Sequence, residues 1–139
     1  MKVLQVVPRI AAHSSGPSYS VTRLGESLAQ AGCELELHVL QPLPDRPLDL
    51  KVKAWPASGW PGAWRLGWSP AMRQGLVDAA RGAAIVHNHS LWMMPNIYCH
   101  EAARRGGAKL VFSPRGTLSE WSLRRSRGRK KLVWLAGQK

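Results

Sequence analysis

Acidic residues and cysteines are scarce in this chain. Its 139 residues include 8 Asp and Glu against 20 Lys and Arg, which gives a formal net charge of +12 at pH 7. Such an excess favours anionic partners, namely nucleic acid, anionic lipid headgroups or phosphorylated small molecules, without choosing among them. The two cysteines, Cys33 and Cys99, lack the spacing of metal ligands, so the sequence predicts a reduced cytoplasmic pair.

Long apolar runs are also absent. The run at residues 3–7 is interrupted by Pro8 and Arg9, so it is too short for a signal peptide, and no segment approaches the length of a transmembrane helix. We therefore expect a cytoplasmic protein, either soluble or bound peripherally at the inner membrane face. Hydrophobic residues make up 45% of the chain and charged residues 20%, which is typical of one globular domain with its own core.

Several motifs that would define an activity are missing. The sequence contains no G-x-G-x-x-G fingerprint of a dinucleotide site and no G-K-[ST] of a Walker loop. It also has no G-x-S-x-G elbow, so a Ser-His-Asp hydrolase is poorly supported. Any phosphate or sugar site must therefore be built from less regular loops.

Buried strands and capped helices alternate along the chain. Apolar or alternating runs predict strands at residues 2–7, 34–40, 50–55, 83–88 and 108–113. A helix is expected to begin with Ser69 as N-cap and Pro70 in its first turn and to end at Gly82. This alternation predicts an α/β fold, a Rossmann-like doubly wound parallel sheet in a single domain, with residues 85–87 and 110–112 as interior strands.

Three loops with polar chemistry follow the carboxyl ends of these strands, where ligands bind in such sheets. His87 and His89 lie two apart on one strand, so their side chains point to the same face. Arg115, beside Gly116, is a planar donor suited to phosphate or carboxylate. Gly16 permits a tight turn and close backbone approach, and the helix that follows presents free N–H groups to a phosphate.

Simpler interpretations stay open for each loop. The histidines can be a structural pair, and zinc is disfavoured because no third ligand has a useful spacing. The Gly16 loop can be an ordinary strand-to-helix connection, and Arg115 a surface arginine in a turn. The basic run at residues 124–131 is either a solvated helix face or, with its interleaved apolar residues, an amphipathic contact with a membrane surface.

Three segments together resemble the N-terminal domain of a GT-B-fold glycosyltransferase of the retaining family 4 (group 1). They are "MKVLQVVPRI…SSGPSYSVTRLGESLAQAGCELELHVL", "IVHNHSLW" and "FSPRGTLSEWSLRRSRGRKK", and the resemblance extends from residue 1 to about residue 131. It implies two Rossmann-like domains with the reaction in the cleft between them, without metal or other cofactor. The N-terminal domain binds a sugar, lipid-linked or polysaccharide acceptor, and the C-terminal domain holds most of the nucleotide-sugar donor.

The resemblance also implies roles for individual residues. Gly16 and Pro17 match the loop that approaches the donor phosphates, and His89 matches the second histidine of a V-H-x-H pattern near the reacting sugar, a catalytic position. Arg115 stands where many relatives have histidine, and Ser90 stands where many have glycine. The remaining candidates for the acceptor or substrate side are Ser18, His87 and Gly116.

Residues 1–139 correspond to the acceptor-side domain only, and the paired-glutamate donor motif of the second domain is absent from them. We therefore expect this chain to be either a truncated or fragmentary part of an enzyme or one half of a split enzyme, and to transfer no sugar by itself. Two alternatives remain, a non-catalytic Rossmann-like binding module and a basic nucleic-acid-binding protein. Nucleic acid is not the expected partner, because the charge is not organised around stacking aromatics.

Overall fold

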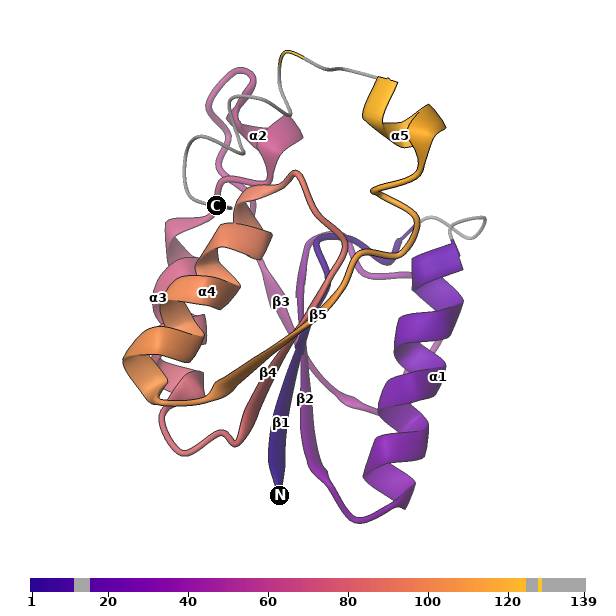
Figure 1. Ribbon diagram of the computed structural model, residues 1–139, viewed down its shortest axis with the longest axis vertical. Coiled ribbons are helices and arrows are strands. Elements are labelled where there is room, and N and C mark those ends of the chain that lie inside the picture. The colour runs from indigo at the N-terminus through magenta and orange to yellow at the C-terminus, as the bar shows by residue number, and fades with distance from the viewer. Residues whose placement is uncertain (12–15, 125–127, 129–139) are drawn as a thin grey trace.

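The structure is a computed structural model that describes residues 1–11, 16–124 and 128. In that part of the chain, a parallel sheet has the strand order β3-β2-β1-β4-β5 (Figure 1). The strands are β1 (Lys2–Val6), β2 (Glu34–Leu40), β3 (Lys51–Trp55), β4 (Ile85–His89) and β5 (Lys109–Ser113). The predicted parallel α/β sheet is confirmed, with strand boundaries that shift by at most a few residues.

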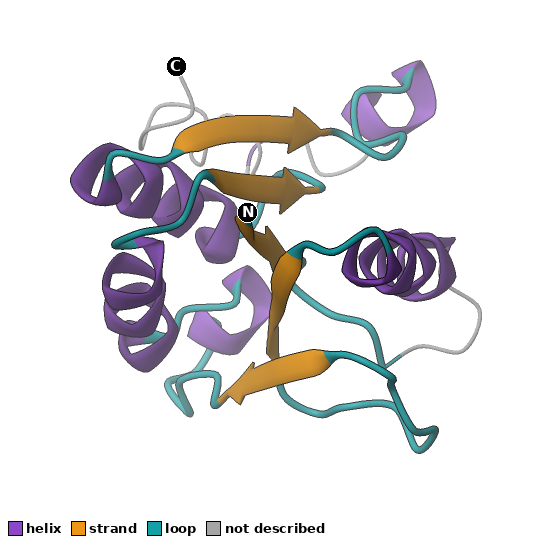
Figure 2. Ribbon diagram, turned by 90° about the horizontal axis from the view of Figure 1, so that it is seen from below, coloured by secondary structure: helices purple, strands orange, loops and turns teal. Residues whose placement is uncertain are grey.

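Helices cover both faces of the sheet. Helix α1 (Gly16–Gln30) lies on one face, and α3 (Pro70–Ala80) and α4 (Met94–Gly106) lie side by side on the other (Figures 1 and 2). Two short helices, α2 (Ala63–Leu66) and α5 (Glu120–Arg124), lie near the carboxyl ends of the strands (Figure 1). The buried core has two parts accordingly, because alternate residues of each strand point to opposite faces.

Helix α3 shows how local sequence sets the boundaries and packing of an element. Ser69 is its N-cap and accepts a hydrogen bond from the Met72 N–H at 3.1 Å, and Pro70 follows as the first helical residue, as predicted. Gly75 lets the helix approach β3, since a Cβ there would lie 2.1 Å from a ring carbon of Trp55. These contacts fix the connection between β3 and α3 at both of its ends.

A polar cluster is buried beneath α3, between β2 and β3. Glu36 receives the Lys51 ammonium at 2.5 Å, and the His38 Nδ1 accepts from the Trp55 Nε1–H at 3.2 Å. Burial lowers the pKa of His38 to about 4, against the opposing effect of Glu36. Burial would raise the pKa of Glu36, but the hydrogen bond from Lys51 and the charge of Lys53 outweigh it and hold that pKa at about 2.

Strand β5 corrects one expectation. Residues 110–112 were expected in an interior strand, but within the described sheet β5 pairs with β4 alone and forms the edge. The side chains of Leu110, Val111 and Phe112 are each 40–42% exposed. A short apolar run is equally typical of an interior strand and of an edge strand that lacks its neighbour, so periodicity could not separate the two.

Two further observations concern membranes and thiols. None of the described helices is both long and apolar enough to cross a membrane.

Cys33 and Cys99 are both free thiols. Cys99 is fully buried in the core between the sheet and α4, and this burial raises the pKa of its thiol.

Candidate functional site at the carboxyl ends of the strands

The centre of the sheet contains a topological switch point. From β1 the chain crosses by α1 to β2 on one side, whereas β4 lies on the other side of β1 and leads into α4 on the opposite face. Figure 2 shows α1 and α4 separated by the sheet in this way. In open α/β sheets, ligands bind beyond the carboxyl ends of the strands at such a point. The predicted site residues of β4 and of the segment after β5 lie here.

The two histidines of β4 lie on the same side of the sheet, as their spacing predicts. Their ring centroids are 3.9 Å apart. The Nε2 of His87 is 2.8 Å from the Oγ of Ser113 at the end of β5. This hydrogen bond joins the carboxyl ends of two neighbouring strands and fixes the His87 ring. His87 is therefore placed to hold the site together, and His89 lies one step further toward the end of the strand.

Arg115 connects three segments that are distant in sequence. Its Nε and Nη2 donate to the Nδ1 of His89 at 3.4 and 3.3 Å. Its Nη1 donates to the Oγ of Ser20 in the second turn of α1 at 3.0 Å, and Ser20 in turn donates to the carbonyl of Gly16 at 2.9 Å. The segment after β5, the end of β4 and the start of α1 are thereby brought together, as the sequence predicts for residues 16, 89 and 115.

The chemistry of His89 follows from these neighbours. Burial, and then the electrostatic effects of His87 and Arg115, lower the pKa of His89 to about 3, so the ring is neutral at physiological pH. Because Nδ1 accepts from Arg115, the single proton of the neutral ring lies on Nε2. That Nε2 atom is buried and has no hydrogen-bond partner among the described residues. Native structures rarely leave such a donor unpaired, and an unpaired donor near a switch point is available to a ligand.

The turn between β4 and α4 has unusual backbone geometry. Ser90 and Trp92 both have left-handed backbone angles, with φ of 75° and 74°. Ser90 occupies the position that the resemblance pairs with glycine, and a left-handed φ is one that glycine adopts without strain. The side chain of Asn96 stabilises the turn: it donates to the Asn88 side chain at 2.7 Å and to the His89 carbonyl at 3.2 Å.

The segment after β5 makes a second strained turn. Arg115 and Gly116 have φ of 50° and 77°, and the Thr117 N–H donates to the Pro114 carbonyl at 3.0 Å. A turn whose two central residues are both left-handed strongly favours glycine, which explains Gly116. Residues with strained backbone angles are common at functional sites, and with its left-handed φ Arg115 points back toward β4, where it donates to His89.

The start of α1 differs from the expectation in detail. The tight turn expected at Gly16 is not found, because Gly16 is already the first residue of α1 and its φ lies outside the left-handed range. A Cβ at Gly16 would meet no atom of the described residues within 4 Å. Pro17 lies in the first turn of the helix. Ser18 is buried, and its carbonyl accepts from Arg46 at 3.1 Å.

Some expectations concern residues outside the described part of the chain. These are the loop at 12–15, and nearly all of the basic run at 124–131. Sequence reasoning in turn missed Ser20 and Asn96. A signal existed for Asn96, because a polar residue in the first turn of a helix that follows a strand often bonds the preceding backbone. None existed for Ser20, whose role depends on a partner 95 residues away.

Among residues 1–11, 16–124 and 128, no three His, Cys, Asp or Glu side chains gather in a way that could hold a metal ion. The site contains instead an arginine, two neutral histidines, hydroxyl groups and the amino-terminal end of a 15-residue helix. Such a set offers hydrogen-bond donors and one fixed positive charge. It suits hydroxyl and phosphate oxygens better than cations.

The chain was compared with known protein families. A family model described as a glycosyl transferase 4-like domain matches residues 15–139, which is most of the chain and includes every residue of the site. No curated protein matches the chain.

Proposed function

The chain belongs to the glycosyl transferase 4-like domain family, and we propose that it forms the acceptor-side, N-terminal part of a glycosyltransferase. The enzyme moves a sugar from a nucleotide-sugar donor to a sugar, lipid-linked sugar or polysaccharide acceptor, with retention of anomeric configuration. The observation that carries the proposal is the junction made by Arg115, which joins His89 of β4 to Ser20 of α1 at the switch point.

The residues divide into two groups by their chemistry. In this proposal the donor phosphates lie at the amino-terminal end of α1, where the positive end of the helix dipole and the backbone N–H of Gly16 attract them, while Pro17, which has no N–H, presets the first turn. Arg115, Gly116 and His87 form the opposite side, toward the sugar hydroxyls of the acceptor. Ser18 lies in the first turn of α1, where its buried position supports the helix end more than it offers a direct contact.

His89 acts in this proposal as a positioned hydrogen-bond donor to the transferred sugar or to the acceptor hydroxyl. With a pKa of about 3, it is a poor proton acceptor at neutral pH, but its Nε2–H is a free donor. The side chain is fully buried. A ligand oxygen reaches Nε2 when the side chains that cover it move aside, while Arg115 keeps its hydrogen bonds to Nδ1 and so holds the proton on Nε2.

Two substitutions of His89 separate a functional donor from a structural ring. In His89→Gln the side-chain N–H lies close to the position of Nε2, whereas in His89→Asn the amide lies close to Nδ1 and the outer donor is lost. In the complete enzyme that carries this domain, we expect His89→Asn to lower turnover about 100-fold, the usual cost of losing one positioned donor, and His89→Gln to retain more. Turnover and melting temperature are measured on both variants.

The proposal fails if the two variants lose turnover equally and in proportion to the decrease in their melting temperatures, because a packing role of His89 predicts that pattern. It also fails if both retain wild-type turnover. For the chain of residues 1–139 by itself, we expect no transfer from any nucleotide sugar, since the described residues provide one side only of a reaction that needs both substrates held together.

The proposed acceptor places the enzyme near a membrane surface. A net charge of +12 and the exposed indole of Trp121 on α5 support peripheral binding to anionic lipid at the cytoplasmic face. Cosedimentation with phosphatidylglycerol vesicles should therefore weaken steeply as salt is raised, whereas binding that is insensitive to salt contradicts an electrostatic association.

A further inference from the structure

Three exposed tryptophans gather in the connection between β3 and α3. This segment, residues 56–69, is called the tryptophan loop here and includes α2. Trp60, Trp64 and Trp68 are 78%, 47% and 44% exposed. Indole rings are large and apolar, and a group of them left in water marks a binding surface more often than a single exposed aromatic does.

Hydrogen bonds hold the tryptophan loop in one arrangement. At its base the Ser58 N–H donates to the Trp68 carbonyl at 2.7 Å, and the Ser69 hydroxyl donates to the Pro56 carbonyl at 2.7 Å. At its tip Arg9, just after β1, donates to the Trp64 carbonyl at 2.8 Å. The exposed rings therefore stand on a fixed backbone, and binding to them costs little ordering of the chain.

The loop borders the candidate site. Gly67 lies against the start of α4, since a Cβ there would be 3.0 Å from the Met93 methyl carbon and 3.2 Å from Pro95. The Ser69 N–H donates to the Tyr98 hydroxyl at 3.2 Å, which adds a second contact with α4. Because α4 directly follows the strand that carries His89, the loop lies on the same carboxyl-end rim of the sheet (Figure 1).

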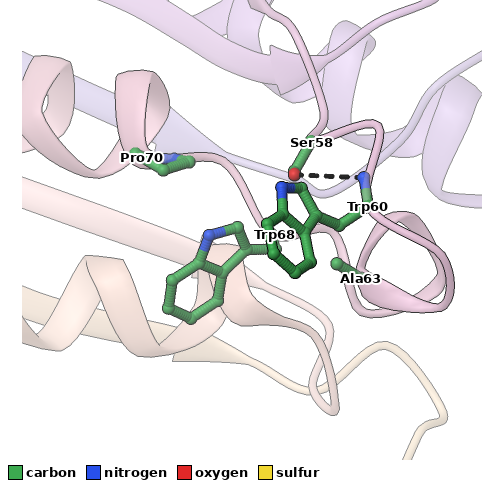
Figure 3. Close-up of a pocket in the computed structure, with 5 residues that line it drawn as sticks. All are labelled: Ser58, Trp60, Ala63, Trp68 and Pro70. Carbon is green, nitrogen blue, oxygen red and sulfur yellow. Dashed lines mark hydrogen bonds between the residues drawn. The ribbon is translucent and has the colours of Figure 1, made fainter.

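Two of the tryptophans line a pocket. Its volume is about 350 Å³, and its lining is formed by Ser58, Trp60, Ala63, Trp68 and Pro70 (Figure 3). Small-molecule pockets range over roughly 300–1,000 Å³, so this one has room for a single ring rather than for a whole nucleotide sugar. None of the described residues that line it is charged. The Ser58 hydroxyl, which accepts weakly from the Trp60 N–H at 3.4 Å, still has its own proton to donate.

We propose that this pocket binds one neutral sugar ring of a carbohydrate acceptor, at a distance from the reacting sugar. The proposal rests on the proposed function, because that function supplies a carbohydrate with more than one ring. A pyranose has an apolar C–H face and a rim of hydroxyl groups. The indole faces of Trp60 and Trp68 suit the first, and the Ser58 hydroxyl and indole N–H groups suit the second.

The concave shape and the fixed backbone favour a sugar over a lipid surface. Trp60 and Trp68 line one open hollow together with Ala63 and Pro70, so a flat ring can contact both indoles at once. An acceptor held here and at the His89 site at once gains from two linked contacts. The tryptophan loop would then select acceptors by the sugar that precedes the one being extended.

The test uses the chain of residues 1–139 and four methyl glycosides, of glucose, galactose, mannose and N-acetylglucosamine. Binding is measured by saturation-transfer NMR and by tryptophan fluorescence. We expect at least one glycoside to bind with millimolar affinity. Trp60→Ala and Trp68→Ala should each weaken that binding about tenfold or more, as loss of an aromatic anchor does. Trp121→Ala is the control, because it removes an exposed indole on α5, away from the pocket lining, and should leave glycoside binding unchanged.

Three results would overturn the proposal. The first is that no glycoside binds, and the second is that the loop variants bind as well as the control. The third is that the loop variants bind uridine or phosphatidylglycerol vesicles less well than the wild-type chain does, while their binding of glycosides is unchanged. Glycoside binding through the two indoles, combined with full activity of the His89 variants, would instead refute only the assigned role of His89. The two proposals can therefore fail separately.

Discussion

Acidification should destabilise the folded chain, because two buried histidines resist protonation. His38 has a pKa of about 4 and His89 one of about 3, both lowered chiefly by burial from an ordinary value of 6.5. A group whose folded pKa is depressed contributes stability that is present above its unfolded pKa and lost as the pH falls toward its folded pKa. For both rings the loss therefore begins near pH 6.5 and continues to the folded value of each.

The size of this destabilisation follows from the thermodynamic linkage between proton binding and folding. At about pH 5 each ring has bound a proton in the unfolded chain but hardly any in the folded one, so each lowers the unfolding free energy by about 2 kcal/mol relative to about pH 8. The two together amount to about 4 kcal/mol, and His87, whose pKa is also lowered by burial, adds to the loss. Total stabilities of roughly 5–15 kcal/mol make this a large change.

Urea denaturation at the two pH values measures the effect. The wild-type chain should lose about 4 kcal/mol or more on going from about pH 8 to about pH 5, and His38→Gln and His89→Gln should each lose about 2 kcal/mol less than that. For each variant the unfolding free energy at about pH 5 is subtracted from that at about pH 8, so a change in the variant's stability at the higher pH does not affect the comparison. A wild-type stability that stays flat over this range would mean that the rings take up protons in the folded state, and the reasoning from burial would be refuted.

Two glycine substitutions give further predictions. Gly75→Ala should lower the free energy of unfolding by about 1–3 kcal/mol in denaturant titrations, because its Cβ would lie 2.1 Å from a ring carbon of Trp55. This loss outweighs the better helix propensity of alanine. A gain in stability would show that the tryptophan has room to move. Gly116→Ala should lower the free energy of unfolding by about 1–2 kcal/mol, because φ of 77° is left-handed. Gly59→Ala provides the comparison, since its φ is not left-handed and its Cβ would meet no described atom within 4 Å. Equal stability of the two variants would contradict a strained turn.

Elements with a strong local pattern could be predicted from sequence. The second strand was placed at residues 34–40, which are the bounds of β2, and α3 begins at the predicted Ser69 cap. The position of β5 at the sheet edge could not be predicted, because strand order depends on long-range pairing that no local pattern encodes. The same holds for Glu36 and His38, whose alternation with leucines is typical of a half-exposed strand although both are buried.

In the candidate site too, local features could be predicted from the sequence and long-range contacts could not. The spacing of His87 and His89 predicted that the rings share a face, because two-residue periodicity is local. The hydrogen bond from Arg115 to Ser20 spans 95 residues and emerged only from the fold. The catalytic and binding roles assigned to these residues remain predictions, and the His89 variants test them.

The position of β5 at the edge of the described sheet bears on how the chain behaves at high concentration. Among the described residues β5 pairs on one side only, and with half-exposed Leu110, Val111 and Phe112 it is a template on which a second copy can add its own edge. The net charge of +12 opposes that approach, since copies repel one another. The repulsion decays over about 10 Å at 0.1 M salt and over about 30 Å at 0.01 M. Colloidal stability should therefore fall as ionic strength rises, and preparations of this chain should stay dispersed best in dilute buffer.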